Sequence, residues 1–177
     1  MSVKRASESN EEITDSYKKQ LTTFGASGSG SGVSCDLKTL SGHQSHYDEP
    51  EALGGKNGGA NPMELLGNAL VACQQVMIEV ISKEKKIDVS HIDWSVEVDI
   101  DIRGLAGDKN VPPEPQKARV KAVVHLPSDQ ASRLQELQDE VEARCPVLTL
   151  YRKGGLELTN DWVVKTVRLQ GKLNANH

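Results

Sequence analysis

Residues 61–84 read NPMELLGNALVACQQVMIEVISKE, and this stretch decides the fold class. Asn61 is a good helix cap, Pro62 suits the first helical position, and Glu64 stands where the acid of a capping box reaches back to the cap. This pattern predicts a buried central helix over residues 61–84, because apolar residues recur every three or four positions. These apolar residues are Leu65, Leu66, Ala69, Leu70, Ala72, Cys73, Val76, Met77, Val80 and Ile81.

Two segments with alternating apolar and polar residues follow this helix. The first covers residues 92–102, and the second covers residues 120–126 after a proline-rich loop. A period of two predicts strands with one buried side and one side facing water.

The carboxyl-terminal part returns to helix and then to strand. A second helix is predicted from Pro127, and the proline after Cys145 interrupts it, because the residue before a proline avoids helical backbone. Cys145 is therefore expected to cap a short helix that ends near Tyr151. Residues 156–158 and 162–169 are expected to form closing strands.

The amino-terminal part is polar and rich in glycine. Residues 1–12 are expected to be loosely ordered, with one domain over residues 13–177. Residues 13–24 could hold a first strand, and the Gly/Ser run at 25–32 is typical of a hairpin loop or a linker. The order of strands, helix, strands, helix and strands indicates an α+β fold.

The composition excludes several classes of protein. A net charge of −4 without a basic stripe gives no reason to expect a nucleic-acid partner. No apolar run approaches the roughly 20 residues that cross a bilayer, and residues 1–12 lack the apolar stretch of a signal peptide. We therefore expect a cytoplasmic protein with no membrane partner and, because only six residues are aromatic, an aliphatic core.

Three cysteines raise the question of which thiol reacts. Cys35 is expected to be a strand or loop thiol without a role, and Cys73 lies on the apolar helix face, where a cysteine is often a small core residue. Cys145 is expected at a helix start, where unpaired N–H groups, helped by Arg144, would lower the pKa of its thiol. Cys73 and Cys145 would suit a cycle in which one is oxidised to sulfenic acid and the other condenses with it.

The segment GGKNGGANPMELLGNALVAC (residues 54–73), followed by ARCPVLTL (residues 143–150), resembles the OsmC and organic-hydroperoxide-resistance family over roughly residues 48–170. The resemblance implies antiparallel sheets around a long central helix and an intertwined homodimer with active sites at the subunit interface. It also implies a thiol-dependent peroxidase that reduces organic hydroperoxides in oxidative-stress defence. Cys73 would then be the peroxidatic thiol and Cys145 the resolving thiol, with a small dithiol or a dithiol protein as reductant.

The sequence departs from the family pattern at two positions. Members with strong peroxidase activity carry a glutamate directly after the helix-opening proline, and here that position is Met63, while Glu64 points about 100° further round the helix. Such members also carry an arginine in the amino-terminal sheet, but no arginine lies between Arg5 and Arg103. Between Arg5 and the start of the long helix at Asn61, the lysines are Lys18, Lys19, Lys38 and Lys56.

Further polar residues flank the glycine-rich loop. Glu49 and Glu51, after Asp48, could line the mouth of a pocket together with Met63 and Glu64, although a short acidic run is also typical of a solvated turn. The glycines at 54–59 lack the Gly-Lys-Ser/Thr ending of a phosphate loop and favour a close backbone approach beside the helix start.

A metal site is the remaining alternative for the polar residues. His43 and His46 have a His-x-x-His spacing and could join Cys35 or Asp48 around a metal. No second closely spaced ligand pair completes a tetrahedral set, so we expect no metal and no other cofactor.

The alternative to an enzyme is a non-catalytic dimer of the same fold. Its pocket would hold a small apolar or lipid-like ligand, with the cysteines only lining it. A thiol peroxidase loses turnover when Cys73 is replaced by Ser, whereas a binding protein keeps its ligand affinity.

Overall fold

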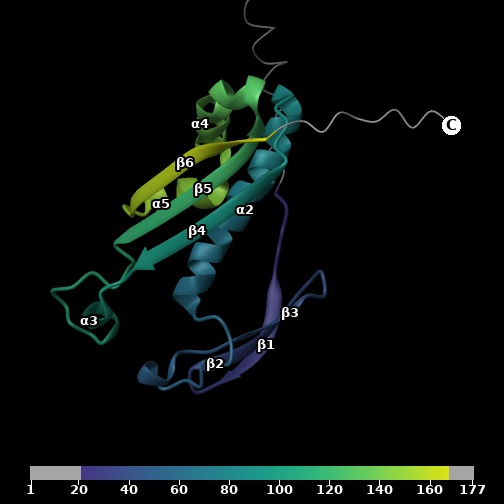
Figure 1. Cartoon of the computed structure of the whole chain (residues 1–177). Coiled ribbons are helices and arrows are strands. Elements are labelled where there is room, and N and C mark those ends of the chain that lie inside the picture. The colour runs from purple at the N-terminus through teal and green to yellow at the C-terminus, as the bar shows by residue number, and fades with distance from the viewer. Residues whose placement is uncertain (1–20, 168–177) are drawn as a thin grey trace, which may run out of the picture.

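The computed structural model describes residues 21–167, which form two three-stranded sheets, one long helix and several shorter helices (Figure 1). The first sheet has the order β1-β2-β3 and the second the order β4-β5-β6. The elements are β1 (Ala26–Ser31), β2 (Ser34–Thr39), β3 (Gln44–Tyr47), η1 (Glu51–Leu53), α2 (Pro62–Lys85), β4 (His91–Asp99), α3 (Ile102–Leu105), β5 (Lys117–Pro127), η2 (Ser128–Arg133), α4 (Leu134–Arg144), α5 (Pro146–Lys153) and β6 (Glu157–Val167).

Helix α2 begins as its sequence predicts. The Asn61 side chain accepts hydrogen bonds from the backbone N–H groups of Met63 and Glu64, both at 2.9 Å. The Glu64 carboxylate accepts in return from the Asn61 N–H at 2.9 Å, which completes the capping box. The helix ends where Lys86 adopts a left-handed conformation, with φ of 56°.

One face of α2 lies in the core, where its buried residues include Leu70, Gln74, Ile78 and Ile81. By length and composition alone, α2 is long and apolar enough to cross a membrane, so the expectation that no run approaches that size is wrong. The reason is that its Leu, Ala, Val and Ile residues outweigh the polar residues between them. The core helix of a water-soluble protein gives the same signal.

The second sheet supplies the other side of that core. Strand β5 pairs antiparallel with β4 and parallel with β6, so the predicted antiparallel pairing has one exception. Helices α2, α4 and α5 lie on one side of this sheet (Figure 1). The β5 residues that face them are fully or almost fully buried, and they are Ala118, Val120, Ala122, Val124 and Leu126.

Three predicted boundaries differ from the structure. Strand β4 ends at Asp99 rather than at residue 102, because Asp101 caps a short helix by accepting from the Arg103 N–H at 3.1 Å. The helix expected from Pro127 begins with the 3-10 turn η2 before α4. The two closing strands are one strand, β6, since parallel pairing with β5 continues through its polar residues 159–161. Residues 168 and 169 lie outside the described part.

The Gly/Ser run that was expected to be a loop or linker is strand β1, so that prediction is wrong. It pairs antiparallel with β2 from Ala26 opposite Thr39 to Ser31 opposite Ser34. Close packing of β1 against β2 explains why glycine stands at position 30, because a Cβ there would lie 2.9 Å from the Ser34 carbonyl oxygen. Most of the strand expected at residues 13–24 lies outside the described residues, and residues 21–24 form no strand.

The first sheet lies beyond the amino-terminal end of α2, away from the second sheet (Figure 1). Every residue of β1 is exposed. The loop 48–61 and a single bridge between Tyr47 and Ala60 connect this sheet to α2. A sheet in this position lacks a core of its own.

Candidate functional site

The structure brings Cys73 and Cys145 together. Cys73 lies in the middle of α2 and is partly exposed, whereas Cys145 lies at the break between α4 and α5 and has no exposed surface. Cys73 packs against the core cluster that contains Cys145, and the two thiols are close enough for Cys73 to affect the pKa of Cys145. The site is therefore a pair of free thiols in contact, one of which solvent can reach.

The chain turns at Cys145 for the reason that its sequence predicts. Cys145 is both the C-cap of α4 and the N-cap of α5, with an extended backbone at φ −72° and ψ 113°. Its N–H donates to the Val141 carbonyl at 2.8 Å, and its own carbonyl accepts from the Thr149 N–H at 3.0 Å. Pro146 opens α5, since it needs no partner for an N–H that it lacks.

The expectation of a lowered pKa at Cys145 is wrong. Burial raises the pKa of the Cys145 thiol to about 11, and the neighbouring Cys73 thiol also raises it. The N–H groups of Leu148 and Val147 act in the expected direction, but their effect is smaller than that of burial. Arg144 points instead to a carboxylate on α2. Cys145 consequently keeps its proton at neutral pH.

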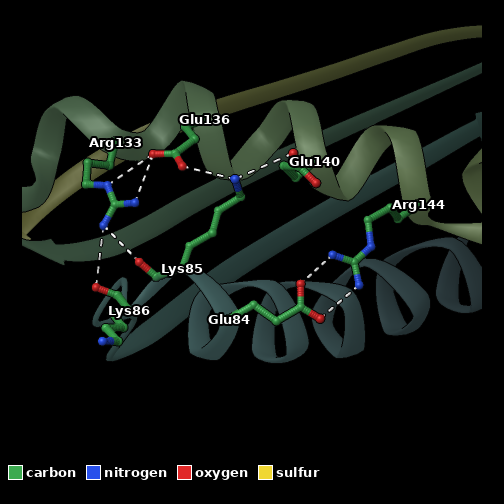
Figure 2. A network of polar contacts seen from close by, with 7 residues as sticks. All are labelled: Glu84, Lys85, Lys86, Arg133, Glu136, Glu140 and Arg144. Atoms are coloured by element: carbon green, nitrogen blue, oxygen red, sulfur yellow. Dashed lines mark hydrogen bonds and ion pairs between the residues drawn. The ribbon is translucent and has the colours of Figure 1, made fainter.

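A network of polar contacts joins the carboxyl end of α2 to α4, and Arg144, the residue before Cys145, belongs to it (Figure 2). The Arg144 guanidinium donates to both carboxylate oxygens of Glu84, at 2.5 and 3.0 Å. Further along α4, Lys85 contacts Glu136 at 3.1 Å and Glu140 at 3.5 Å. Arg133 donates to Glu136 and to the carbonyls of Lys85 and Lys86, so it also covers the carboxyl end of α2.

A second contact anchors the other side of the break. The Tyr151 hydroxyl, on α5, donates to the Leu66 carbonyl oxygen of α2 at 2.6 Å. Nothing in the local sequence pattern indicated this contact or the one between Arg144 and Glu84, because each joins residues that lie far apart along the chain.

The second-tier candidates are not brought to the cysteines within one chain. Met63 and Glu64 occupy the first turn of α2, and ten residues of helix place Met63 about 15 Å from Cys73. Both line a hollow of about 320 Å³ between α2 and β4, and Glu64 is engaged in the capping box. Glu49 and Glu51 lie in the loop that leads from β3 to α2.

Asp48 has a structural role that the sequence reasoning missed. It is only 5% exposed, and its carboxylate accepts from the backbone N–H groups of Glu49, Lys56 and Gly58 at 3.0, 2.8 and 3.1 Å. The donors at Gly58 and Lys56 hold the pKa of Asp48 below its ordinary value. The predicted close approach of the glycines is confirmed, because a Cβ at Gly55 would overlap the Glu49 carbonyl. An aspartate just before a glycine-rich loop is the signal that could have revealed this role.

The histidines and Cys35 have other partners. His46 shares a hydrogen bond of 2.8 Å with the Asp36 carboxylate, and His43 lies in the turn between β2 and β3. Cys35 lies in β2 opposite Tyr47. Within residues 21–167, no group of three or more His, Cys, Asp or Glu side chains is placed to hold a metal ion.

Fold and site thus define an α+β protein with a thiol pair between the middle of its long helix and the break between α4 and α5. The sequence pattern of the family described as OsmC-like protein matches residues 55–159, which is more than half of the chain. The chain belongs to the OsmC-like family, as its resemblance implied. Membership suggests a role in hydroperoxide resistance or redox chemistry. No curated protein sequence matches the chain.

Solved structures share the fold at low sequence identity. An organic hydroperoxide resistance protein from Elizabethkingia anophelis aligns with a TM-score of 0.66 at 23% identity, over 84% of this chain and 100% of that one. The OsmC protein of Legionella pneumophila gives 0.63 at 22% identity, over 82% and 100%. An OsmC-like protein of unknown function from Vibrio cholerae gives 0.62 at 10% identity, over 83% and 100%. These likenesses establish the fold.

Proposed function

We propose that this protein is a thiol-dependent peroxidase that reduces organic hydroperoxides in oxidative-stress defence. The observation that carries the proposal is the contact between the partly exposed Cys73 and the buried Cys145. A peroxidase of this kind needs one thiol that the peroxide can reach and a second thiol close enough to form a disulfide with it.

The reaction divides into three balanced steps. The Cys73 thiolate attacks the outer peroxide oxygen, the O–O bond breaks, and the leaving alkoxide takes up a proton from water, so the products are an alcohol and a sulfenic acid on Cys73. The Cys145 thiol condenses with that sulfenic acid, which forms the disulfide and releases water. A dithiol reductant then restores both thiols by exchange and leaves as its own disulfide.

The different environments of the two sulfurs support this division of roles. Because Cys145 retains its proton at neutral pH, it can supply that proton to the hydroxide that leaves Cys73 during condensation. Burial also protects Cys145 from direct oxidation by the peroxide, so that it stays available for resolution. The cytoplasm, where thiols are kept reduced, suits such a cycle.

The working unit that we propose is a homodimer. Helix α2 leaves an apolar stripe uncovered that includes Val76, which is 61% exposed, and Val80, which is 39% exposed. The first sheet is also exposed, and among the described strands β4 pairs only with β5, which leaves its other edge open. A second copy of the chain would cover these surfaces.

The alternative is a non-catalytic dimer that binds a small apolar ligand. A second hollow of about 320 Å³ between α2 and β4, distinct from the one that Met63 and Glu64 line, favours the binding protein. Its lining includes the apolar residues Val71, Trp94 and Val96. Met63 in place of the family's glutamate favours it as well.

One experiment separates the two functions. Consumption of cumene hydroperoxide with dithiothreitol as reductant is measured for the wild type and for Cys73→Ser and Cys145→Ser. The peroxidase proposal expects turnover by the wild type and none by Cys73→Ser. A wild type that consumes no peroxide, and an apolar fluorescent ligand that binds equally to the wild type and Cys73→Ser, would establish the binding protein instead.

A further inference from the structure

Three residues on one side of α2 contact the segment that α4 and α5 form. Leu66 precedes Cys73 by seven residues, and Glu84 follows it by eleven. At 3.6 residues per turn these spacings are close to two and three full turns, so Leu66, Cys73 and Glu84 share one stripe of the helix. The stripe covers about 27 Å of helix length, with Cys73 between its ends.

Three residues of the α4–α5 segment contact the three residues of that stripe, in the reverse order along the chain. Arg144, directly before Cys145, donates to Glu84, while Tyr151, six residues after Cys145, donates to the Leu66 carbonyl. Cys145 lies between these two anchors and contacts Cys73. The break between α4 and α5 is therefore fixed to α2 on both sides of the thiol pair.

We propose that Arg144 and Tyr151 are positioning residues that hold Cys145 within bonding reach of Cys73. The inference rests on the proposed dithiol chemistry of this pair. The extended backbone at Cys145 interrupts helical hydrogen bonding, so α4 and α5 can pivot about it unless other contacts prevent this. A disulfide tolerates only a narrow range of Cα separations, and a small shift of the break lowers the effective concentration of one thiol at the other.

The remaining contacts of the segment supply a matched control. Arg152 of α5 pairs with Glu142 of α4 at 2.5 Å, in the same manner as Arg144 pairs with Glu84. That pair joins α4 to α5 without a contact to α2. Loss of Arg152 thus removes an arginine–glutamate pair close to the break but neither of the anchors.

The test is the equilibrium of the Cys73–Cys145 disulfide in the full chain, with Cys35→Ser as the background. The protein is equilibrated with oxidised and reduced dithiothreitol, so that two protein thiols are oxidised as one cyclic disulfide is reduced. We expect the effective concentration of the pair to fall about two- to fivefold in Arg144→Met and about fivefold in Tyr151→Phe. We expect no change in Arg152→Met.

Two further variants separate positioning from general stability. Glu84→Arg alone is expected to lower the effective concentration, and Glu84→Arg combined with Arg144→Glu is expected to restore it. Urea unfolding of each reduced variant gives its stability. The inference is overturned if Arg144→Met and Tyr151→Phe match Arg152→Met, or if the effective concentration follows only the loss of stability across all variants.

The result is independent of peroxide turnover. If the wild-type disulfide forms and responds to the anchors but no cumene hydroperoxide is consumed, the proposed function fails and the positioning inference stands. If the wild type consumes peroxide while all variants share its effective concentration, the positioning inference fails alone. If no dithiothreitol ratio yields the wild-type disulfide, both are wrong.

Discussion

The Cys145 thiol is fully buried beside the partly exposed Cys73, so the two sulfurs of the pair differ in their access to solvent. This asymmetry assigns different chemistry to two residues of the same type. The partly exposed sulfur meets reagents first, and the buried one reacts with its neighbour. This difference between the two thiols leads to predictions for their reactivity and for the dependence of stability on pH.

Alkylation should distinguish the two thiols. At pH 8, we expect iodoacetamide to modify Cys73 at least about tenfold faster than Cys145, because Cys145 is both protonated and shielded. The rate at Cys145 should rise with pH toward about 11, where its thiol ionises. Peptide mass spectrometry after timed quenching measures both rates. Equal rates at pH 8 would contradict this picture of the site.

The same pKa makes stability depend on pH in the alkaline range. In the unfolded chain the Cys145 thiol ionises near pH 9, but in the folded protein it keeps its proton until about pH 11. The unfolded state therefore binds fewer protons between these values, and stability falls as pH rises. We expect a loss of about 1–2 kcal/mol from this residue between pH 8.5 and 11. Urea unfolding of the reduced protein measures it, and Cys145→Ser should show a smaller loss.

Gln74 is a second buried polar group with an expected effect on stability. It is 0% exposed, and neither atom of its amide has a hydrogen-bond partner within residues 21–167. Replacing it by methionine keeps the shape and removes the unpaired groups, so we expect Gln74→Met to raise the free energy of unfolding by about 1–2 kcal/mol. Gln75 is the control: it is exposed and accepts from the Trp94 indole at 2.9 Å, and Gln75→Met should bring no gain. A destabilised Gln74→Met would show that the amide has a partner in solution.

Asp48 should determine the conformation of the glycine-rich loop. Asp48→Asn removes the charge and one acceptor oxygen, so we expect the amide hydrogens of Lys56 and Gly58 to exchange about tenfold faster. Hydrogen exchange followed by NMR measures the change. Glu51→Gln, an exposed neighbour, should leave these rates unaltered. Because the pKa of Asp48 is lowered, the protection should persist to acidic pH and be lost only as that carboxyl takes up a proton.

The uncovered stripe of α2 should determine the assembly. We expect the wild type to sediment as a dimer and Val76→Lys to sediment as a monomer, because a charge would lie in the apolar contact between copies. Leu150→Lys is the control, since Leu150 on α5 is 66% exposed but lies off that stripe. A monomeric wild type, or a dimer that tolerates Val76→Lys but not Leu150→Lys, would disprove this arrangement.

The sequence correctly predicted those elements that depend on residues close together along the chain. The capping box at Asn61, the long helix and the break at Cys145 all follow from side chains within a few residues of each other. Strand β1 was missed because glycine and serine have little strand preference of their own, and the pairing with β2 overrides it. The pKa of Cys145 was predicted in the wrong direction because the helix start is local, whereas the burial that outweighs it comes from distant segments. The contacts of Arg144 and Tyr151 were not predicted for the same reason, because their partners on α2 lie far away along the chain.

The most direct test of the proposed function is the fate of the two sulfurs after one equivalent of cumene hydroperoxide. Reduced protein is treated in the absence of a reductant, alkylated, digested and analysed by mass spectrometry. The proposal expects a peptide pair joined by a Cys73–Cys145 disulfide, and a sulfenic acid on Cys73 when Cys145 is replaced by Ser. Peroxide-treated protein with no such bond and with an unoxidised Cys73 would contradict it.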